Sequence, residues 1–179
     1  MTFPRTGDAA PDLTIDDARG ETLRLSDWRG HPVVLVFLRH LGCPICRMEL
    51  AELRRQHDAF ARLDARVVVF VDATPDRVAS FAQREDVALH LVGDGQRRVY
   101  EQYGVRRGGL REFAAPGAAL RSVRATLKGH LHGRFEGSER QLPADLVIDG
   151  EGIVRFAHLG AHIGDNTPLE ELLEQCRRL

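Results

Sequence analysis

Two solid runs of apolar residues, joined by an amphipathic segment, constrain the fold of this chain most. Val33–Leu38 and Arg66–Asp72 show little of the apolar–polar alternation of a half-exposed strand, so we predict strands covered on both faces. The segment between them, residues 44–62, puts apolar side chains near one stripe and charged side chains on the other side, which predicts a helix. Such a strand–helix–strand unit implies that the two strands are parallel neighbours.

The rest of the chain is predicted to complete an α/β fold with a central mixed sheet and helices on both faces. Further elements are expected as helices over about 74–84, 95–103 and 167–178, a short strand over 89–92, and an antiparallel hairpin over 146–157. In that hairpin we expect Ile148 to pair with Ile153, which would place Pro143 opposite His158. With 179 residues, of which 43% are apolar, residues 1–179 are predicted to form a single domain.

Charge and apolar run lengths exclude several classes of protein. The formal net charge of −1 gives no overall attraction to nucleic acid. The longest clean apolar run, Val33–Leu38, is too short for a membrane span, which takes about 20 residues. The first residues carry no apolar signal segment, and three cysteines do not make a disulfide-stapled fold. A cytoplasmic protein is therefore expected.

The segment of about 106–140 is predicted to be an insertion with a basic helix. Residues 97–134 hold eight arginines and one lysine against two glutamates, and 118–130 has helical periodicity. Leucine and valine side chains are expected on one face, packed on the domain, with Arg121, Arg124 and Lys128 on another. The three basic residues are either a solvated surface or a site for an anionic ligand, a lipid surface or a partner.

The pair Cys43 and Cys46 carries the strongest functional signal. Pro44 suits the first position of the helix, so Cys43 falls at the helix N-terminus, where free N–H groups and the helix dipole favour an anion. Thiols of C-x-x-C pairs reach a pKa of about 3.5 to 7, against about 8.5 for a free cysteine. Redox chemistry is the leading interpretation, with Cys43 attacking and Cys46 resolving. Zinc binding would need two more ligands in a fitting pattern, and inert packing is the other alternative.

Several neighbours complete the predicted site. Arg39 and His40 end the strand that leads to Cys43, so either can stabilise a thiolate. Pro143, at the start of the late hairpin, is a candidate for a cis peptide bond that exposes backbone to a substrate; an ordinary trans proline is the alternative. His158 is expected at the same groove.

The segments around these residues resemble the alkyl hydroperoxide reductase/thiol-specific antioxidant (AhpC/TSA, peroxiredoxin-like) branch of the thioredoxin superfamily. The resemblance rests on GDAAPDL at 7–13, LSDWRGHPVVL at 25–35, FLRHLGCPICR at 37–47 and QLPADLVID at 141–149. It implies a thioredoxin-like fold with a cis-proline strand, and Cys43 as the peroxidatic or attacking thiol with Cys46 as its partner. The chain departs from typical members at two points. His40 replaces their Thr or Ser, and the stretch where they supply an arginine starts here with Pro143, with Arg140 three residues earlier.

These observations together predict a thiol oxidoreductase that reduces a peroxide or a disulfide. A thioredoxin-like or small-thiol reductant would reset the cysteine pair, and no metal or organic cofactor is required. We expect no nucleic acid partner, and a homodimer is an open possibility. The competing hypothesis is a binding or regulatory protein that does not catalyse repeated turnover. It would sense oxidation through its cysteines, or bind an anionic ligand through the basic insertion.

Overall fold

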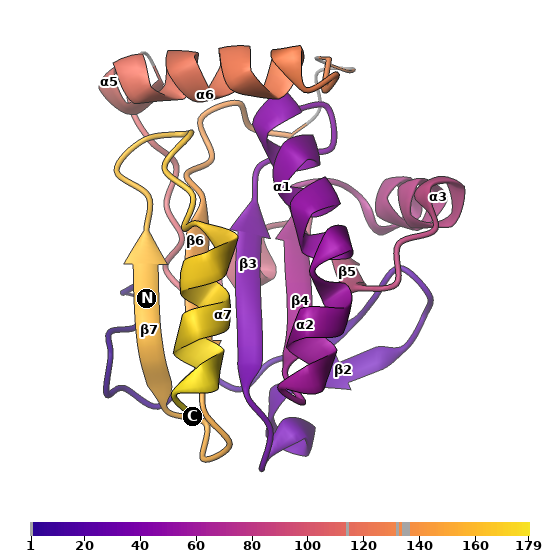
Figure 1. Ribbon diagram of the computed structural model, residues 1–179, viewed down its shortest axis with the longest axis vertical. Coiled ribbons are helices and arrows are strands. Elements are labelled where there is room, and N and C mark those ends of the chain that lie inside the picture. The colour runs from indigo at the N-terminus through magenta and orange to yellow at the C-terminus, as the bar shows by residue number, and fades with distance from the viewer. Residues whose placement is uncertain (1, 114, 132, 134–136) are drawn as a thin grey trace.

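A five-stranded mixed sheet forms the centre of the computed structural model (Figure 1), which describes residues 2–113, 115–131, 133 and 137–179. The strand order is β5-β4-β3-β6-β7; β3, β4 and β5 are parallel, whereas β6 is antiparallel to both β3 and β7. The predicted mixed sheet with an antiparallel C-terminal hairpin is thus confirmed. The strands are β3 (Val33–Leu38), β4 (Arg66–Val71), β5 (His90–Gly93), β6 (Ala144–Ile148) and β7 (Val154–Leu159).

The central strand β3 is buried on both faces because its alternate side chains enter two separate cores. Val34, Val36 and Leu38 face one cluster, and Val33, Leu35 and Phe37 face the other. The first cluster is covered by α1 (Pro44–Arg55), α2 (His57–Arg62), α3 (Pro75–Glu85) and α7 (Leu169–Arg177). The second is covered by α4 (Arg98–Gln102) and by a hairpin missed in the sequence, β1 (Thr14–Asp16) with β2 (Thr22–Arg24), which leads into the 3-10 helix η1 (Leu25–Trp28).

Two helix boundaries differ from prediction. The helix expected over residues 44–62 is divided at Gln56, whose backbone (φ −97°, ψ 7°) separates α1 from α2. The last helix begins at Leu169, with Pro168 rather than Thr167 in the N-cap position. Neither change alters the predicted order of the elements.

The register of the C-terminal hairpin is a correction. Ile148 pairs with Val154, one residue later than expected, and a bulge follows Val147. The cause is the turn: the Asp149 carboxylate accepts hydrogen bonds from the N–H groups of Glu151 and Ile153, 2.9 Å each, and so holds a wider loop than the two-residue turn expected.

The insertion contains α5 (Leu110–Phe113) and α6 (Pro116–Leu127), and α6 lies across the end of the sheet where β3 leads into α1 (Figure 1). The expected packing of its large apolar face is wrong. Leu120 and Leu127 are 73% and 84% exposed, and the residues buried are Ala118 and Ala125. Ala125 belongs to the core cluster that α1 also lines, whereas Ala118 packs in a small cluster with Leu142 and Ile163. This face of α6 therefore lies inward, and the larger side chains point outward.

Candidate functional site

The two thiols lie at the junction between β3 and α1, as predicted. Cys43 is the N-cap of α1 and Pro44 occupies its first turn. Both thiols are buried, Cys43 with 1% of its surface exposed and Cys46 with 6%, and neither is in a disulfide. The sequence folds this way locally because proline needs no N–H partner at the first position of a helix. An N–H group of the first turn, that of Cys46, is therefore free to donate to the Cys43 sulfur.

Two donors converge on the sulfur of Cys43. Arg39 Nη2 donates to Cys43 Sγ over 2.8 Å, and the Cys46 N–H donates to the same sulfur over 3.1 Å. Arg39 is itself buried, so water screens its charge little. A guanidinium and a helix N-terminus on one sulfur favour its thiolate, which is the nucleophilic form.

The two thiols titrate as a pair. Burial raises the pKa of both thiols. For Cys46 this effect of burial is outweighed by the hydrogen bond from Cys43 and by the charges of Arg39 and His40, which together lower its pKa to about 6. Burial and the contact with Cys46 raise the pKa of Cys43 well above its usual value. Since the sulfurs share a hydrogen bond, the first proton lost belongs to the pair. We place the resulting anion on Cys43, because Arg39 and the Cys46 N–H both donate there.

Glu139 is a site residue that the sequence reasoning missed. Its side chain lies 2.9 Å from His40 Nε2 and 3.5 Å from Arg39 Nη1, and its carbonyl accepts a hydrogen bond from Arg39 over 2.9 Å. These contacts hold both side chains beside the thiols, as predicted for Arg39 and His40. The available signal was one acidic residue at the end of a basic segment, just before Pro143.

The insertion also passes close to the first cysteine. The Gly133 N–H donates to the carbonyl of Gly42, the residue before Cys43, over 2.8 Å. Further along, the Ser138 N–H donates to Asp72 Oδ2 over 3.3 Å, and Arg97 lies 3.5 Å from the same oxygen. Asp72 follows β4 at the sheet edge where Cys43 lies, so it anchors the insertion there.

Pro143 and His158 do not take the predicted arrangement. Every peptide bond among the described residues is trans, so the predicted cis bond before Pro143 is wrong. The wider hairpin turn and the bulge together place His158 opposite Asp145, and the Pro143 carbonyl accepts from the Gly160 N–H over 2.9 Å. His158 lies in the edge strand β7, where its Nε2 is 2.8 Å from the Asp165 carbonyl, and not at the thiols.

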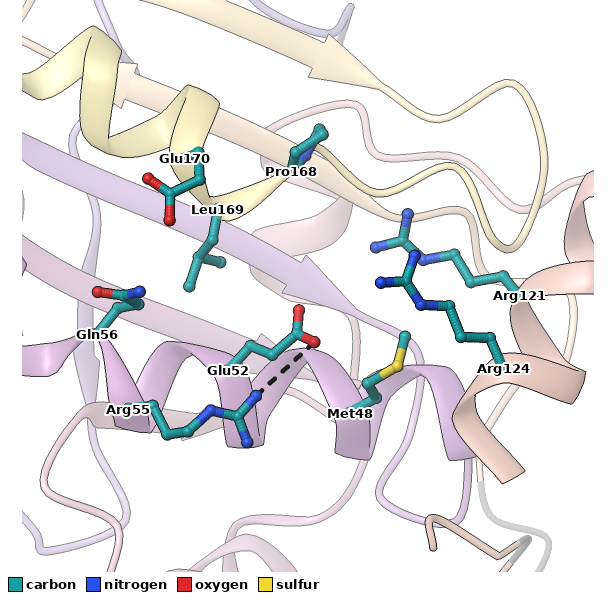
Figure 2. A pocket seen from close by; sticks show the side chains of 9 residues that line it. All are labelled: Met48, Glu52, Arg55, Gln56, Arg121, Arg124, Pro168, Leu169 and Glu170. Carbon is teal, nitrogen blue, oxygen red and sulfur yellow. Dashed lines mark ion pairs between the residues drawn. The ribbon is translucent and has the colours of Figure 1, made fainter. Parts of the chain in front are cut away.

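The three basic residues proposed for an anion separate into different environments. Arg121 Nη2 lies 3.1 Å from the buried Glu49, and Lys128 Nζ lies 2.8 Å from Glu52. Arg121 and Arg124, but not Lys128, line a pocket between α1, α6 and α7 (Figure 2). Lys128 therefore fixes α6 to α1 by an ion pair and lies outside that pocket.

Cys176 is separate from the C-x-x-C pair. It is buried in α7, whose last turn lies at the opposite end of the molecule from the start of α1 (Figure 1). Burial raises the pKa of its thiol to about 11, which keeps it protonated and unreactive at neutral pH.

One cluster of possible metal ligands lies elsewhere among the described residues: Asp17, Glu21 and His90. Arg19 Nη2 lies 3.2 Å from Asp17 Oδ2 and 3.1 Å from His90 Nδ1. A guanidinium so placed already provides the positive charge that a cation would bring, so ion pairing accounts for the cluster.

A buried carboxyl pair beneath α6 leads to a stability prediction. Burial and the nearby Asp145 raise the pKa of Glu49 to about 8, and burial raises that of Asp145 to about 6. A carboxyl whose pKa is raised on folding stabilises the fold below its unfolded pKa and loses that contribution as pH rises through the folded value. The free energy of unfolding is therefore expected to fall by roughly 2–4 kcal/mol between pH 4.5 and 8.

Glu49→Gln is expected to flatten this dependence, because glutamine does not ionise. Urea unfolding followed by circular dichroism at a series of pH values measures it. Glu170→Gln, an exposed carboxyl at the start of α7, is the matched control. An unchanged slope in Glu49→Gln would show that Glu49 ionises normally.

Comparison with known proteins identifies the family of this chain. The model of the AhpC/TSA family matches residues 6–157, which is most of the chain and includes both thiols and Pro143. The chain belongs to the AhpC/TSA family. This AhpC/TSA chain is 30% identical to peroxiredoxin Bcp of Bacillus subtilis over 99 residues, 55% of its own length and 63% of the length of that relative. It is 24% identical to the chloroplastic thioredoxin-like protein AAED1 of Arabidopsis thaliana, over 96% of the chain and 73% of that protein.

Solved structures show the same fold. Peroxidoxin BcpB of Mycobacterium tuberculosis matches with a TM-score of 0.68 and 24% identity, over 97% of both chains. A peroxiredoxin-like protein from Aquifex aeolicus matches with a TM-score of 0.72 and 17% identity, over 99% of this chain and 89% of its own. The predicted thioredoxin-like fold is confirmed. In the described part of the AhpC/TSA chain, the helices are too short or too polar to cross a bilayer.

Proposed function

We propose that this protein is a thiol-dependent peroxidase in which Cys43 reduces a peroxide and Cys46 resolves the product. The observation that carries the proposal is the donation from Arg39 to Cys43 Sγ over 2.8 Å at the N-terminus of α1. This contact favours the thiolate and leaves guanidinium N–H groups beside the reacting sulfur, where they can also bind a peroxide oxygen. Membership of the AhpC/TSA family and similarity to peroxiredoxin Bcp support it.

The proposed cycle has three balanced steps. The Cys43 thiolate attacks one peroxide oxygen, the O–O bond breaks, and the leaving alkoxide or hydroxide takes a proton to give an alcohol or water, with Cys43 as sulfenic acid. Cys46 then attacks the sulfenic sulfur; a disulfide forms and water leaves with the Cys46 proton. An external dithiol is oxidised to its own disulfide and returns Cys43 and Cys46 to thiols.

Burial of the attacking sulfur favours a peroxide over a protein disulfide as the oxidant. Cys43 is 1% exposed, and Gly133 crosses beside it. A protein disulfide must bring its own sulfur in line with the thiolate, which requires an open approach to the site, whereas a peroxide presents two small oxygen atoms. A cytoplasmic location with a thioredoxin-like or small-thiol reductant is part of the proposal, since that compartment maintains dithiols in reduced form. Because reduction needs the same in-line approach, the proposal includes local opening of the site once the Cys43–Cys46 disulfide has formed. A homodimer stays a prediction.

The test is a stopped-flow comparison of hydrogen peroxide and a small model disulfide with the reduced protein. We expect the peroxide to react much faster than with an unactivated thiol, and the rate to rise with pH up to a plateau as the thiol pair loses its first proton. The rate rises rather than falls with pH because the thiolate is the reactive form. Faster reaction with the disulfide, or no reaction above the level of a free thiol, would contradict peroxide reduction.

Continued turnover separates this enzyme from a redox sensor. With a dithiol reductant present, an enzyme consumes many equivalents of peroxide, whereas a sensor is oxidised once. A single equivalent consumed, with the pair then resistant to the reductant, would favour the sensor.

A further inference from the structure

A pocket outside the thiol site lies between three helices (Figure 2). It has a volume of about 370 Å³ and lies against later turns of α1, the inner side of α6 and the start of α7. This volume is in the range of sites that hold small molecules, about 300–1,000 Å³. Neither Cys43 nor Arg39 is among its lining residues. The pocket is therefore a place for a ligand that the thiol chemistry does not use.

The pocket contains more positive charge than its carboxylates cancel. Three arginines, Arg55, Arg121 and Arg124, line it, against the two carboxylates of Glu52 and Glu170. Arg55 lies 3.7 Å from Glu52, but Glu52 also accepts from Lys128 over 2.8 Å and so already has a closer partner. Within the described part of the chain, Arg124 has no hydrogen bond or ion pair to hold its side chain.

The charge of Arg121 is also available to a ligand. Its partner Glu49 is 2% exposed, and burial raises the pKa of Glu49 to about 8, so this carboxyl is mostly protonated at pH 7. Arg121 Nη1 otherwise lies 3.4 Å from a backbone carbonyl, that of Asn166, which carries no net charge. Two guanidinium groups thus remain without a full counter-charge on the same wall of the pocket.

The geometry directs these two groups inward. Figure 2 shows the side chains of Arg121 and Arg124 extending from α6 toward Pro168 at the start of α7. The first turn of α7 has no side-chain cap, but Glu170 and Glu171 in that turn offset the positive potential of its N–H groups. Met48 of α1 and Leu169 of α7 are large apolar side chains that line the pocket, and Figure 2 shows the Glu52 carboxylate between them. A cationic end with apolar side chains nearby suits a molecule that has an anionic head and a small apolar body.

We propose that this pocket binds a small organic anion, whose carboxylate or phosphate group is held by Arg121 and Arg124 and whose apolar part lies against Met48 and Leu169. Guanidinium groups bind either head group through paired, charge-assisted hydrogen bonds. Lys128, which we had grouped with the two arginines from the sequence, has no part in this site, because it is paired with Glu52.

The experiment titrates the reduced, full-length protein with phenyl phosphate and with benzoate, followed by two-dimensional amide NMR. We expect saturable shifts of the Met48 and Leu169 amides with at least one probe, and the better probe identifies the head group. Orthophosphate, which lacks the apolar body, is expected to bind more weakly than phenyl phosphate. Shifts confined to other surfaces, or no saturable binding of either probe, would overturn the proposal.

Matched variants distinguish the pocket from general surface charge. Arg124→Gln is expected to weaken binding of the better probe by about tenfold, because a charge-assisted hydrogen bond is lost. Arg111→Gln removes the same charge from an exposed position of α5 in the same insertion, and should keep the wild-type affinity. An equal loss in both variants would overturn the proposal. Thermal unfolding of each variant verifies that the fold is intact.

Discussion

Replacement of Cys43 by serine is expected to lower the rate of peroxide reduction by about 10³-fold or more, to the background rate. A serine hydroxyl is not ionised near neutral pH, so the donors on this position would have no anion to stabilise. Replacement of Cys46 by serine is expected to leave the first oxidation of Cys43 intact and to abolish turnover with a dithiol reductant, because the sulfenic acid is no longer resolved. Stopped-flow oxidation and coupled turnover measure the two steps separately.

Cys176→Ser is the matched control for both variants, since it makes the same substitution at a buried thiol far from the start of α1. It should retain oxidation and turnover. Full turnover in Cys46→Ser would mean that the external thiol resolves the sulfenic acid directly. Oxidation at the wild-type rate in Cys43→Ser would assign the attack to Cys46 and contradict our placement of the anion.

Replacement of Arg39 by glutamine is expected to lower the rate of peroxide reduction at pH 7 by about 10²–10³-fold, the range found when one preorganised donor is removed from an active site. The guanidinium that donates to Cys43 Sγ is lost, so the first pKa of the thiol pair should rise by about 1 to 3. Both effects act in the same direction at neutral pH. Thiolate absorbance against pH measures the pKa, and stopped-flow oxidation measures the rate.

Two further variants test the specificity of that effect. Arg39→Lys keeps a positive charge but loses the planar fork, and should recover part of the lost rate. Arg140→Gln removes a charge from an exposed position near the late strand and should behave like the wild type. If Arg140→Gln lost as much activity as Arg39→Gln, the effect would not be specific to the arginine that follows β3 and donates to the thiol.

The sheet could be predicted from the sequence because the strands that form it are apolar throughout. Val33–Leu38 and the run from Arg66 can bury both faces only as parallel strands inside an α/β fold. The hairpin register could not be predicted, because it depends on hydrogen bonds that the Asp149 carboxylate accepts and that widen the turn by one residue. The N-terminal hairpin was missed because strands of three residues carry almost no periodic signal.

The orientation of α6 shows a different limit. Its periodicity correctly indicates a helix with one large apolar face, and burial of that face is the usual outcome. In this protein Ala118 and Ala125 are the buried residues of α6, while Arg121 and Lys128 contact the carboxyl groups of Glu49 and Glu52 on α1. Helical periodicity describes faces but contains no information on which face the rest of the chain can accommodate.

By itself the sequence determined the position of the thiol pair at the start of the helix, because Pro44 and the C-x-x-C spacing are local properties of adjacent residues. Only the tertiary structure decided what surrounds that pair. Arg39 donates to Cys43, Glu139 contacts Arg39 and His40 from 100 residues further along the chain, and His158 lies in the edge strand β7. These contacts arise between segments distant in sequence, and their distances depend on strand register and loop paths that local residue patterns do not specify.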